Sequence, residues 1–226
     1  MKLYYDLHIH SALSPCSEDD MTPNNIINMA YIKKIDLISV TDHNSMKNYP
    51  ALEKIASKRN IKILPGIEVT TKEEVHMLCY FNSYKEGMIF SDKIYDSLNK
   101  IVNKPEIFGN QIVYDEEDRK IGEEKFLLNN TSEYSVEEIY HMVKNHKGIC
   151  VPAHVSRLAN GIIGVLGFIP QDLDFKYIEV CKKSNNIADK YLDKYKILVN
   201  SDAHKLTEIS ERLNFIELDN LNSFIY

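Results

Sequence analysis

Short apolar runs alternate with segments of helical periodicity along most of this chain, and no other feature constrains its fold as strongly. The apolar runs have the length and composition of buried strands. Strands that alternate with helices are typical of β/α units. Strands are predicted at residues 2–7, 36–41, 61–65, 75–81, 148–152, 177–181 and 196–200. Seven such strands favour an α/β fold of the TIM-like type, a distorted (β/α)7 barrel.

Local signals place helices between these strands. Thr22 followed by Pro23 offers an N-cap and a proline at the first helical position. Pro50 begins a second helix, and Ser135 with Glu138 has the spacing of a capping box. These helices separate successive strands, as β/α units require.

The alternation is interrupted at about residues 82–134. This stretch combines a helix predicted near residues 91–102 with a charged, hairpin-like sequence, QIVYDEEDRKIG. A chain of 226 residues fits one domain, so we interpret the stretch as an insertion beside the barrel of a single domain spanning residues 1–226. The glycine-rich residues 160–170, NGIIGVLGFIP, predict a mobile flap or a packed loop rather than a helix.

The charge balance bears on possible partners. The net charge is −6 and there is no obvious basic stripe, so long nucleic acid is not expected and a small phosphorylated substrate is favoured. Bound divalent cations would still attract phosphate locally. The N-terminus lacks the apolar run of a signal peptide, and no run approaches membrane-spanning length. We expect a cytoplasmic location and no membrane partner, whereas the oligomeric state stays open.

Candidate metal ligands lie on or just after most of the predicted strands. They are His8, His10, Asp42, His43, Glu68, His76, His154, Asp202 and His204, with Glu179 as a weak candidate. The carboxyl ends of barrel strands converge on one face, so distant ligands become neighbours. Residues i and i+2 of an extended strand point the same way, so an H-x-H pair can bind one ion. Imidazole with carboxylate donors suits zinc, manganese or iron.

Each of these ligands also has a purely structural explanation. An isolated H-x-H is a weak signal, His76 could be a hydrogen-bonded core residue, and Glu68 could cap the segment after Pro65. However, six of the eight histidines fall at or just past predicted strands, whereas His141 and His146 fall on a predicted helix. This joint pattern favours a metal centre.

The motifs DLHIHS, TDHNS, GIEVT, EEVH, PAHV and SDAH occur in this order across almost the whole chain. In these motifs the sequence resembles the PHP (polymerase and histidinol phosphatase) family of metal-dependent phosphoesterases. The resemblance implies the PHP fold, a distorted seven-stranded barrel, and two or three divalent ions (Zn, Mn or Fe).

The resemblance also implies which residues bind each ion. The ligands of the first ion would be His8, His10, Glu68 and Asp202. The second ion would share Glu68 and add His76 and His154. The third ion would be bound by His43, His204 and a residue of the loop after H-x-H. In that loop Cys16 is the closest positional match, and a thiolate binds zinc or iron well. A free loop thiol is the alternative, with Glu18, Asp19 or Asp20 as the ligand.

The expected reaction is hydrolysis of a small phosphomonoester, a nucleotide or a phosphorylated metabolite, by a metal-activated hydroxide. Arg157 is placed to stabilise phosphoryl charge, although it could also be a solvated surface residue. Weaker cationic candidates are Lys182, Lys183 and Lys205. The leaving alkoxide needs a proton, which Asp202, His204 or His43 could deliver.

Three other functions use the same residues. A phosphodiesterase or nuclease acting on short or cyclic nucleotides would need a more open groove than a monoesterase. Amidohydrolase-like cleavage of C–N bonds is disfavoured, because no lysine bridge is seen. A non-catalytic, metal-binding accessory module is the remaining alternative, but the ligand set of the two-metal core is intact in this chain.

Overall fold

The computed structural model describes residues 1–181, 191, 193–219 and 222–225. The strands are β1 (Lys2–Ile9), β2 (Leu37–Val40), β3 (Lys62–Ile63), β4 (Gly66–Thr70), β5 (His76–Phe81), β6 (Ile112–Tyr114), β7 (Lys120–Glu123), β8 (Gly148–Pro152), β9 (Tyr177–Cys181), β10 (Lys196–Asn200) and β11 (Phe215–Glu217). The helices are α1 (Pro23–Ile32), α2 (Tyr49–Lys58), α3 (Tyr84–Ser97), α4 (Pro105–Phe108), α5 (Val136–Asn145), α6 (Ile162–Leu166), α8 (Asn222–Ile225) and a 3-10 turn, η1 (Leu206–Glu208).

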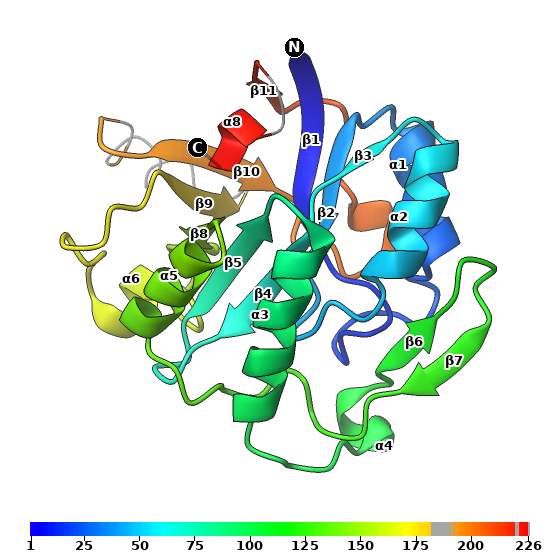
Figure 1. The fold of residues 1–226 in the computed structure, drawn as a ribbon, viewed down its shortest axis with the longest axis horizontal. Coiled ribbons are helices and arrows are strands. Elements are labelled where there is room, and N and C mark those ends of the chain that lie inside the picture. The colour runs from blue at the N-terminus through cyan, green and yellow to red at the C-terminus, as the bar shows by residue number, and fades with distance from the viewer. Residues whose placement is uncertain (182–190, 192, 220–221, 226) are drawn as a thin grey trace.

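The described strands form small sheets of mixed direction (Figure 1). Their orders are β11-β1-β2-β3, β4-β5-β8, β10-β9 and β6-β7. The pairs β1–β2, β2–β3 and β9–β10 are parallel, whereas β4–β5, β5–β8, β1–β11 and β6–β7 are antiparallel. The mixed α/β class is therefore confirmed, but the predicted closed seven-stranded barrel is not, because no continuous ladder joins these sheets.

Side chains take the place of a backbone ladder where β10 lies beside β1. Past the end of β10, one backbone bridge in the described structure joins Ala203 to Ile9, the last residue of β1. Along the strands themselves, side-chain oxygens accept the backbone N–H groups. These bonds run from Leu7 N to Asn200 Oδ1 (2.9 Å), from Val199 N to Tyr5 OH (3.2 Å) and from Ser201 N to Asp6 Oδ1 (3.1 Å). Side-chain bonds of this kind satisfy buried N–H groups without closing a ladder.

The predicted third and fourth strands differ most from the structure. Pro65 has no N–H, and it separates the short β3 from β4, a strand that the sequence did not predict. Residues 71–75 then make a tight reversal, in which Thr71 N donates to Val75 O at 2.9 Å and Glu74 has φ +67°. A reversal of this length joins antiparallel strands, because a parallel crossover needs a dozen or more residues. His76 therefore lies on the predicted fourth strand, at the start of β5, but this strand runs antiparallel to β4 and β8 instead of parallel.

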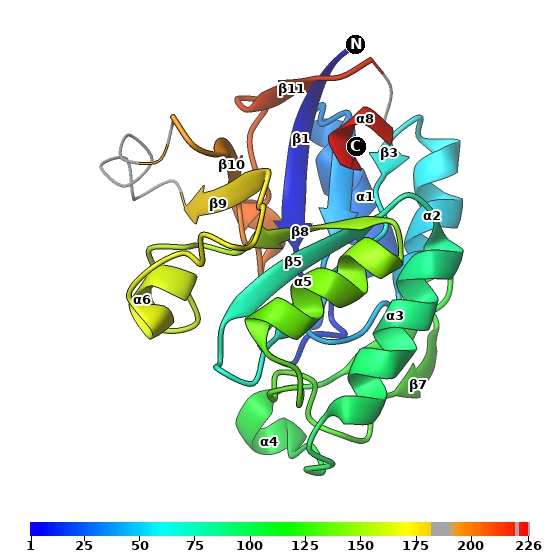
Figure 2. The ribbon, with the colours of Figure 1, turned by 60° about the vertical axis from the view of Figure 1, so that its left-hand side comes forward.

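The helices cover the sheets as their apolar faces require. Helices α3 and α5 lie side by side over β4, β5 and β8, and α1 and α2 pack near β2 and β3 (Figures 1 and 2). Thr22 caps α1, and Ser135 with Glu138 forms the predicted capping box of α5. Helix α3 begins earlier than predicted because Ser83 caps it by accepting from Glu86 N.

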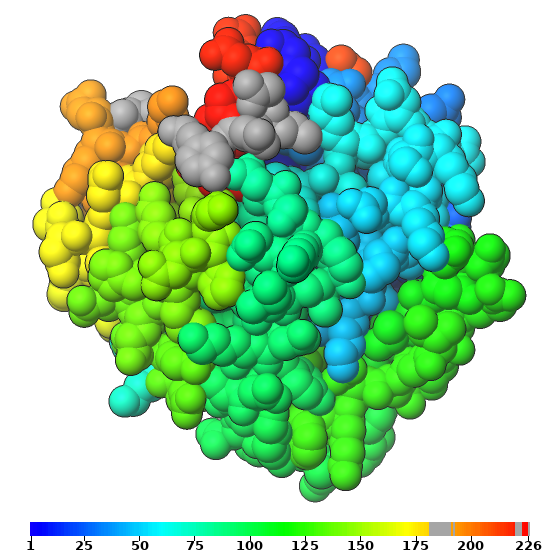
Figure 3. Space-filling model, viewed as in Figure 1, coloured from blue at the N-terminus to red at the C-terminus, as the bar shows by residue number. Residues whose placement is uncertain are grey.

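Two irregular segments flank the core. Residues 112–123 form the β6–β7 hairpin, which lies with α4 along one edge of the molecule (Figures 1 and 3). Within residues 160–170 the structure has the short helix α6, where no helix was expected. Across the described chain, no helix combines the length and the apolarity that crossing a membrane would require.

Candidate metal centre

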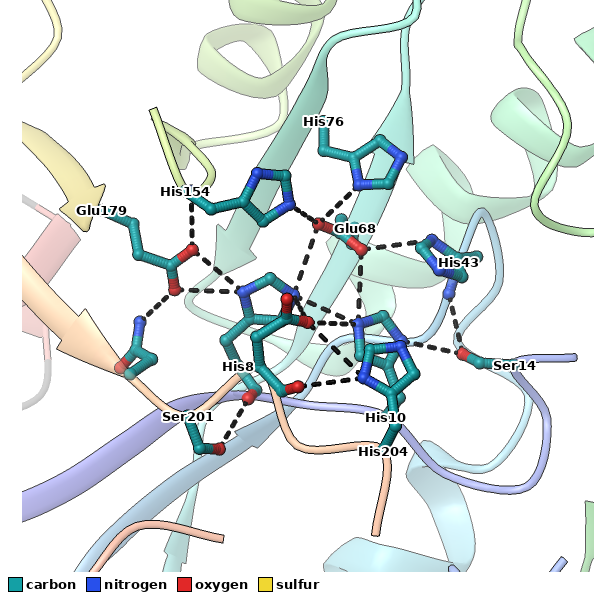
Figure 4. A network of polar contacts seen from close by, with 12 residues as sticks. His8, His10, Ser14, His43, Glu68, His76, His154, Glu179, Ser201 and His204 are labelled. Atoms are coloured by element: carbon teal, nitrogen blue, oxygen red, sulfur yellow. Dashed lines mark hydrogen bonds and ion pairs between the residues drawn. The ribbon is translucent and has the colours of Figure 1, made fainter. Parts of the chain in front are cut away.

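Eight of the predicted metal ligands, Glu68 among them, form one cluster centred on the Glu68 carboxylate (Figure 4). They come from the end of β1, the loop after β2, the middle of β4, the start of β5, and the loops after β8 and β10. The antiparallel direction of β5 explains why His76 belongs to the cluster: its first residue lies at the same end as the last residues of its neighbours.

Both oxygens of Glu68 face imidazole nitrogens. Oε1 lies 3.0 Å from His76 Nδ1, 3.3 Å from His8 Nε2 and 3.3 Å from His154 Nε2. Oε2 lies 3.1 Å from His43 Nδ1 and 3.3 Å from His10 Nε2. One buried carboxylate therefore lies between two groups of nitrogen donors, which is the position of a bridging ligand.

Asp202 forms the other acidic side of the cluster. Its Oδ1 lies 3.3 Å from His8 Nε2 and 3.4 Å from His10 Nε2, while Oδ2 accepts a 2.6 Å hydrogen bond from Arg157 Nη2. His204 stacks on the ring of His10 at 4.3 Å between centroids. Its Nδ1 donates to the backbone carbonyl of Asp202 at 2.9 Å. The proton on Nδ1 leaves His204 Nε2 as a lone-pair donor.

The donor atoms fit a metal better than they fit one another. His8 Nε2 and His10 Nε2 are 3.1 Å apart, and the opposite nitrogen of each ring is bound by an acceptor. Two lone pairs facing each other at this distance repel, and a proton or a metal cation between them removes the repulsion. In addition, Nδ1 of His43 and of His76, Nε2 of His154 and Oε1 of Glu68 are buried close to one another but outside hydrogen-bond geometry. Buried polar atoms are rarely left so, and divalent cations would satisfy them.

The charges of the cluster shift its pKa values in opposite directions. Burial alone would lower the pKa of His8, but Glu179, Asp202 and Glu68 raise it well above its usual range. Burial alone would raise the pKa of Glu68, but His76 and His8 hold it well below its usual range. His76 differs, because burial lowers its pKa to about 4. The carboxylates are therefore ionised near neutral pH, ready to bind cations.

Three overlapping sets of donor atoms have the spacing of a metal site. Each set has its donor atoms within 4.8 Å of one another: His8, His10 and Glu68; His43, Glu68 and His76; His10, His43 and His204. Glu68 belongs to two of the sets, and His10 and His43 each link two. The cluster thus fits divalent-metal binding, and its third set corresponds to the predicted third ion.

Cys16 lies at the edge of this third set. Its side chain is exposed, and its thiol interacts with His43, where it opposes burial and raises the pKa of His43 to about 9. The loop is held at the cluster because Glu18 N donates to His204 O at 3.0 Å. The loop acids point elsewhere: Glu18 pairs with Lys205 at 2.8 Å and Asp19 accepts from Asn110 at 2.7 Å.

Several buried residues that orient the histidines were missed or undervalued. Glu179 accepts from Nδ1 of His8, with both oxygens at 3.0 Å. Ser14 Oγ lies 2.9 Å from His10 Nδ1 and donates to Asp42 Oδ1 at 2.7 Å. The sequence predicts Asp42 as a candidate ligand, but in the structure its oxygens accept hydrogen bonds from Ser11 and Ser14. For Glu179 the sequence offers one signal, an acidic side chain within an otherwise apolar strand.

The remaining residues considered in the sequence lie at the edge of the cluster or away from it. Arg157 is half-exposed and reaches the cluster through Asp202. Lys205 pairs with Glu18, and Lys182 and Lys183 lie outside the described residues. His141 and His146 lie away from the cluster on α5 and its C-cap, where they contact Glu137 and Glu86.

Comparisons with known proteins point to one domain family. The model of the PHP domain family matches residues 6–205. A 5'-3' exoribonuclease from Haemophilus influenzae is 27% identical over 70 residues, which are 31% of this chain and 24% of that protein. The 5'-3' exoribonuclease Rnm of Salmonella typhimurium is 28% identical over 74 residues, 32% of this chain and 24% of its own length. The matches thus span about a quarter of each relative.

Similar folds occur among solved structures. The lesion-specific endonuclease PfuEndoQ from Pyrococcus furiosus has a TM-score of 0.71 and 22% identity, over 98% of this chain and 54% of that one. Endonuclease Q in complex with a 27-mer duplex that carries an abasic lesion has a TM-score of 0.66 and 21% identity, over 91% of this chain and 50% of that one. This chain therefore corresponds to about half of those proteins.

The prediction that excluded long nucleic acid as a partner is wrong. The two sequence relatives are named as exoribonucleases, and one of the similar structures holds duplex DNA. The net charge of −6 is an average over the whole surface, whereas a phosphate at the centre would meet the local charge of Arg157 and of any bound cations. The net charge alone therefore does not exclude nucleic acid as a partner.

Proposed function

This chain belongs to the PHP domain family, and from that premise we propose that it is a metal-dependent phosphodiesterase that hydrolyses nucleic acid or short nucleotides. The observation that carries the proposal is the position of Glu68, which lies between nitrogen donors on both oxygens. The names of the relatives support nucleic acid as the substrate rather than a small phosphomonoester.

We assign the ligands to two core ions and a third. His8, His10, Glu68 and Asp202 would bind the first ion, and Glu68, His76 and His154 the second. His43, His204 and Cys16 would bind the third, with His10 nearby. Zinc, manganese and iron suit this mixture of donors. When bound, divalent cations would activate a water molecule and neutralise charge on the phosphoryl oxygens.

The chain itself supplies the remaining groups. Arg157 lies beside Asp202, so its guanidinium can stabilise negative charge on a phosphate that approaches the cluster. His204 keeps its Nδ1 proton on the Asp202 carbonyl and exposes part of its ring. Asp202 is ionised, and His204 Nε2 holds a lone pair when no third ion is bound, so we propose that one of them takes the proton of the attacking water and passes it to the leaving oxygen.

The test is hydrolysis by chelator-treated protein that has been reloaded with zinc, manganese or iron(II). The substrates are end-labelled RNA and DNA oligonucleotides, a cyclic dinucleotide and mononucleotides. We expect metal-dependent cleavage of the oligonucleotides, and losses of about 100-fold or more for Glu68→Gln and Asp202→Asn, because each removes a charge from the cluster.

His141→Ala is the matched control, because His141 is an exposed histidine on α5 whose side chain lies beside Glu137 and Tyr140, away from the cluster. It should keep wild-type activity. Cleavage of mononucleotides alone would overturn the phosphodiesterase assignment. Stoichiometric metal binding without hydrolysis of any substrate would instead favour an accessory module.

A further inference from the structure

Glu179 is a buried carboxylate on β9, with 1% of its surface exposed. It lies on the side of the His8 ring away from Glu68, as Figure 4 shows. An ionised side chain at this depth is costly unless hydrogen-bonded groups compensate it. Its partners therefore indicate why the chain places a glutamate there.

Three N–H donors converge on the two oxygens of Glu179. His8 Nδ1 lies 3.0 Å from both oxygens, Asn200 Nδ2 donates to Oε1 at 2.7 Å, and His154 N donates to Oε2 at 2.8 Å. A carboxylate accepts at both oxygens, whereas a glutamine would turn an NH2 group toward one of these donors. The site thus requires a carboxylate and not merely a polar side chain of this length.

These contacts join three segments that carry candidate metal ligands. His8 ends β1, His154 follows β8, and Asn200 ends β10, two residues before Asp202. Asn200 also accepts from Leu7 N through Oδ1 at 2.9 Å, so the network fixes the backbone beside His8. Among the described strands no ladder joins β1 to β10, so side-chain bonds help to set the separation of these two strands.

We infer that Glu179 is a positioning residue: it holds His8 as the Nδ1–H tautomer with Nε2 directed at the metal cluster, and it fixes His154 and the β10 end at the same time. The inference rests on the proposed metal centre. Both Glu179 oxygens are already occupied by N–H groups on the far side of His8, so Glu179 is not itself a ligand.

The first test measures zinc affinity by competition with a chelating dye in wild type and Glu179→Gln. Partners that orient a ligand histidine contribute 10- to 100-fold to metal affinity, so we expect a loss of about that size at one core site. Glu124→Gln is the control, since it neutralises a buried carboxylate that pairs with Lys47 instead. It should bind zinc as wild type does.

A second measurement needs no variant. Long-range nitrogen–proton NMR of the histidines in zinc-loaded wild type should show His8 protonated at Nδ1 and metal-bound through Nε2. A metal-bound Nδ1, or a zinc ion on a Glu179 oxygen, would overturn the inference, as would unchanged zinc affinity in Glu179→Gln. If wild type bound no divalent metal at all, the proposed function would fail first.

Discussion

At the scale of single residues, the metal centre depends on side chains whose second polar atom is held in place. His8 is held by Glu179, His10 by Ser14, and Ser14 in turn by Asp42. Glu179 can only accept, so His8 must carry a proton on Nδ1. The Ser14 hydroxyl gives its proton to Asp42, so it accepts from Nδ1 of His10. The candidate ligands are thus pre-oriented before any ion binds.

The proposed role of Cys16 as a ligand of the third ion can be tested by substitution. Serine cannot supply a thiolate, so Cys16→Ser should bind one zinc ion fewer per chain than wild type at the same free zinc concentration. Metal analysis after equilibrium dialysis measures this directly. Asp19→Asn is the matched control in the same loop, because Asp19 contacts Asn110. If Asp19→Asn lost a zinc ion and Cys16→Ser bound as many as wild type, the ligand would be Asp19 and not Cys16.

At the scale of elements, the loop between β8 and α6 connects the cluster to the surface. Arg157 N donates to His154 O at 2.8 Å, and His76 N donates to Asn160 O at 2.8 Å. Gly161 allows this close packing: a Cβ there would meet Arg157 O at 2.4 Å and His154 O at 2.8 Å. The loop that carries Arg157 is therefore fixed by backbone contacts.

Gly161→Ala should displace Arg157 and weaken catalysis. We expect a loss of stability of about 1–3 kcal/mol from overpacking, and at least about a 10-fold loss of hydrolysis because the guanidinium is misplaced. Thermal unfolding and initial rates measure the two effects. Gly122→Ala is the control, since a Cβ there meets its nearest atom at 3.9 Å. Equal rates in both variants would contradict the role assigned to this loop.

At the scale of the whole molecule, the cluster joins parts of the chain that no ladder connects. Its residues come from the sheet of β1 and β2, from the sheet of β4, β5 and β8, and from the end of β10. The concentration of buried charge makes the metal-free centre costly, because ionised groups at this depth need partners. Metal ions would therefore act as cross-links between the sheets.

We accordingly expect metals to stabilise the fold. A ligand that binds only the folded state at 100 times its Kd contributes about 2.7 kcal/mol, which raises the Tm of a domain this size by roughly 5–10 °C. Differential scanning calorimetry with zinc or manganese, followed by excess chelator, checks this. A Tm that stays constant, although dialysis shows bound metal, would mean that the ions do not join the sheets.

The sequence by itself determined the alternating pattern, the capped helices and the identity of the clustered residues, because periodicity, caps and metal-ligand types are local properties. It did not determine the antiparallel direction of β5, the separation of β3 from β4 at Pro65, or the missing ladder between β1 and β10 among the described strands. These features depend on which strands pair although they lie far apart in the sequence. Tertiary structure alone decided that Glu179 accepts from the His8 imidazole and the Asn200 amide, and that Asp42 accepts from serine hydroxyls. A carboxylate becomes a ligand or a support only through the atoms that folding brings next to it.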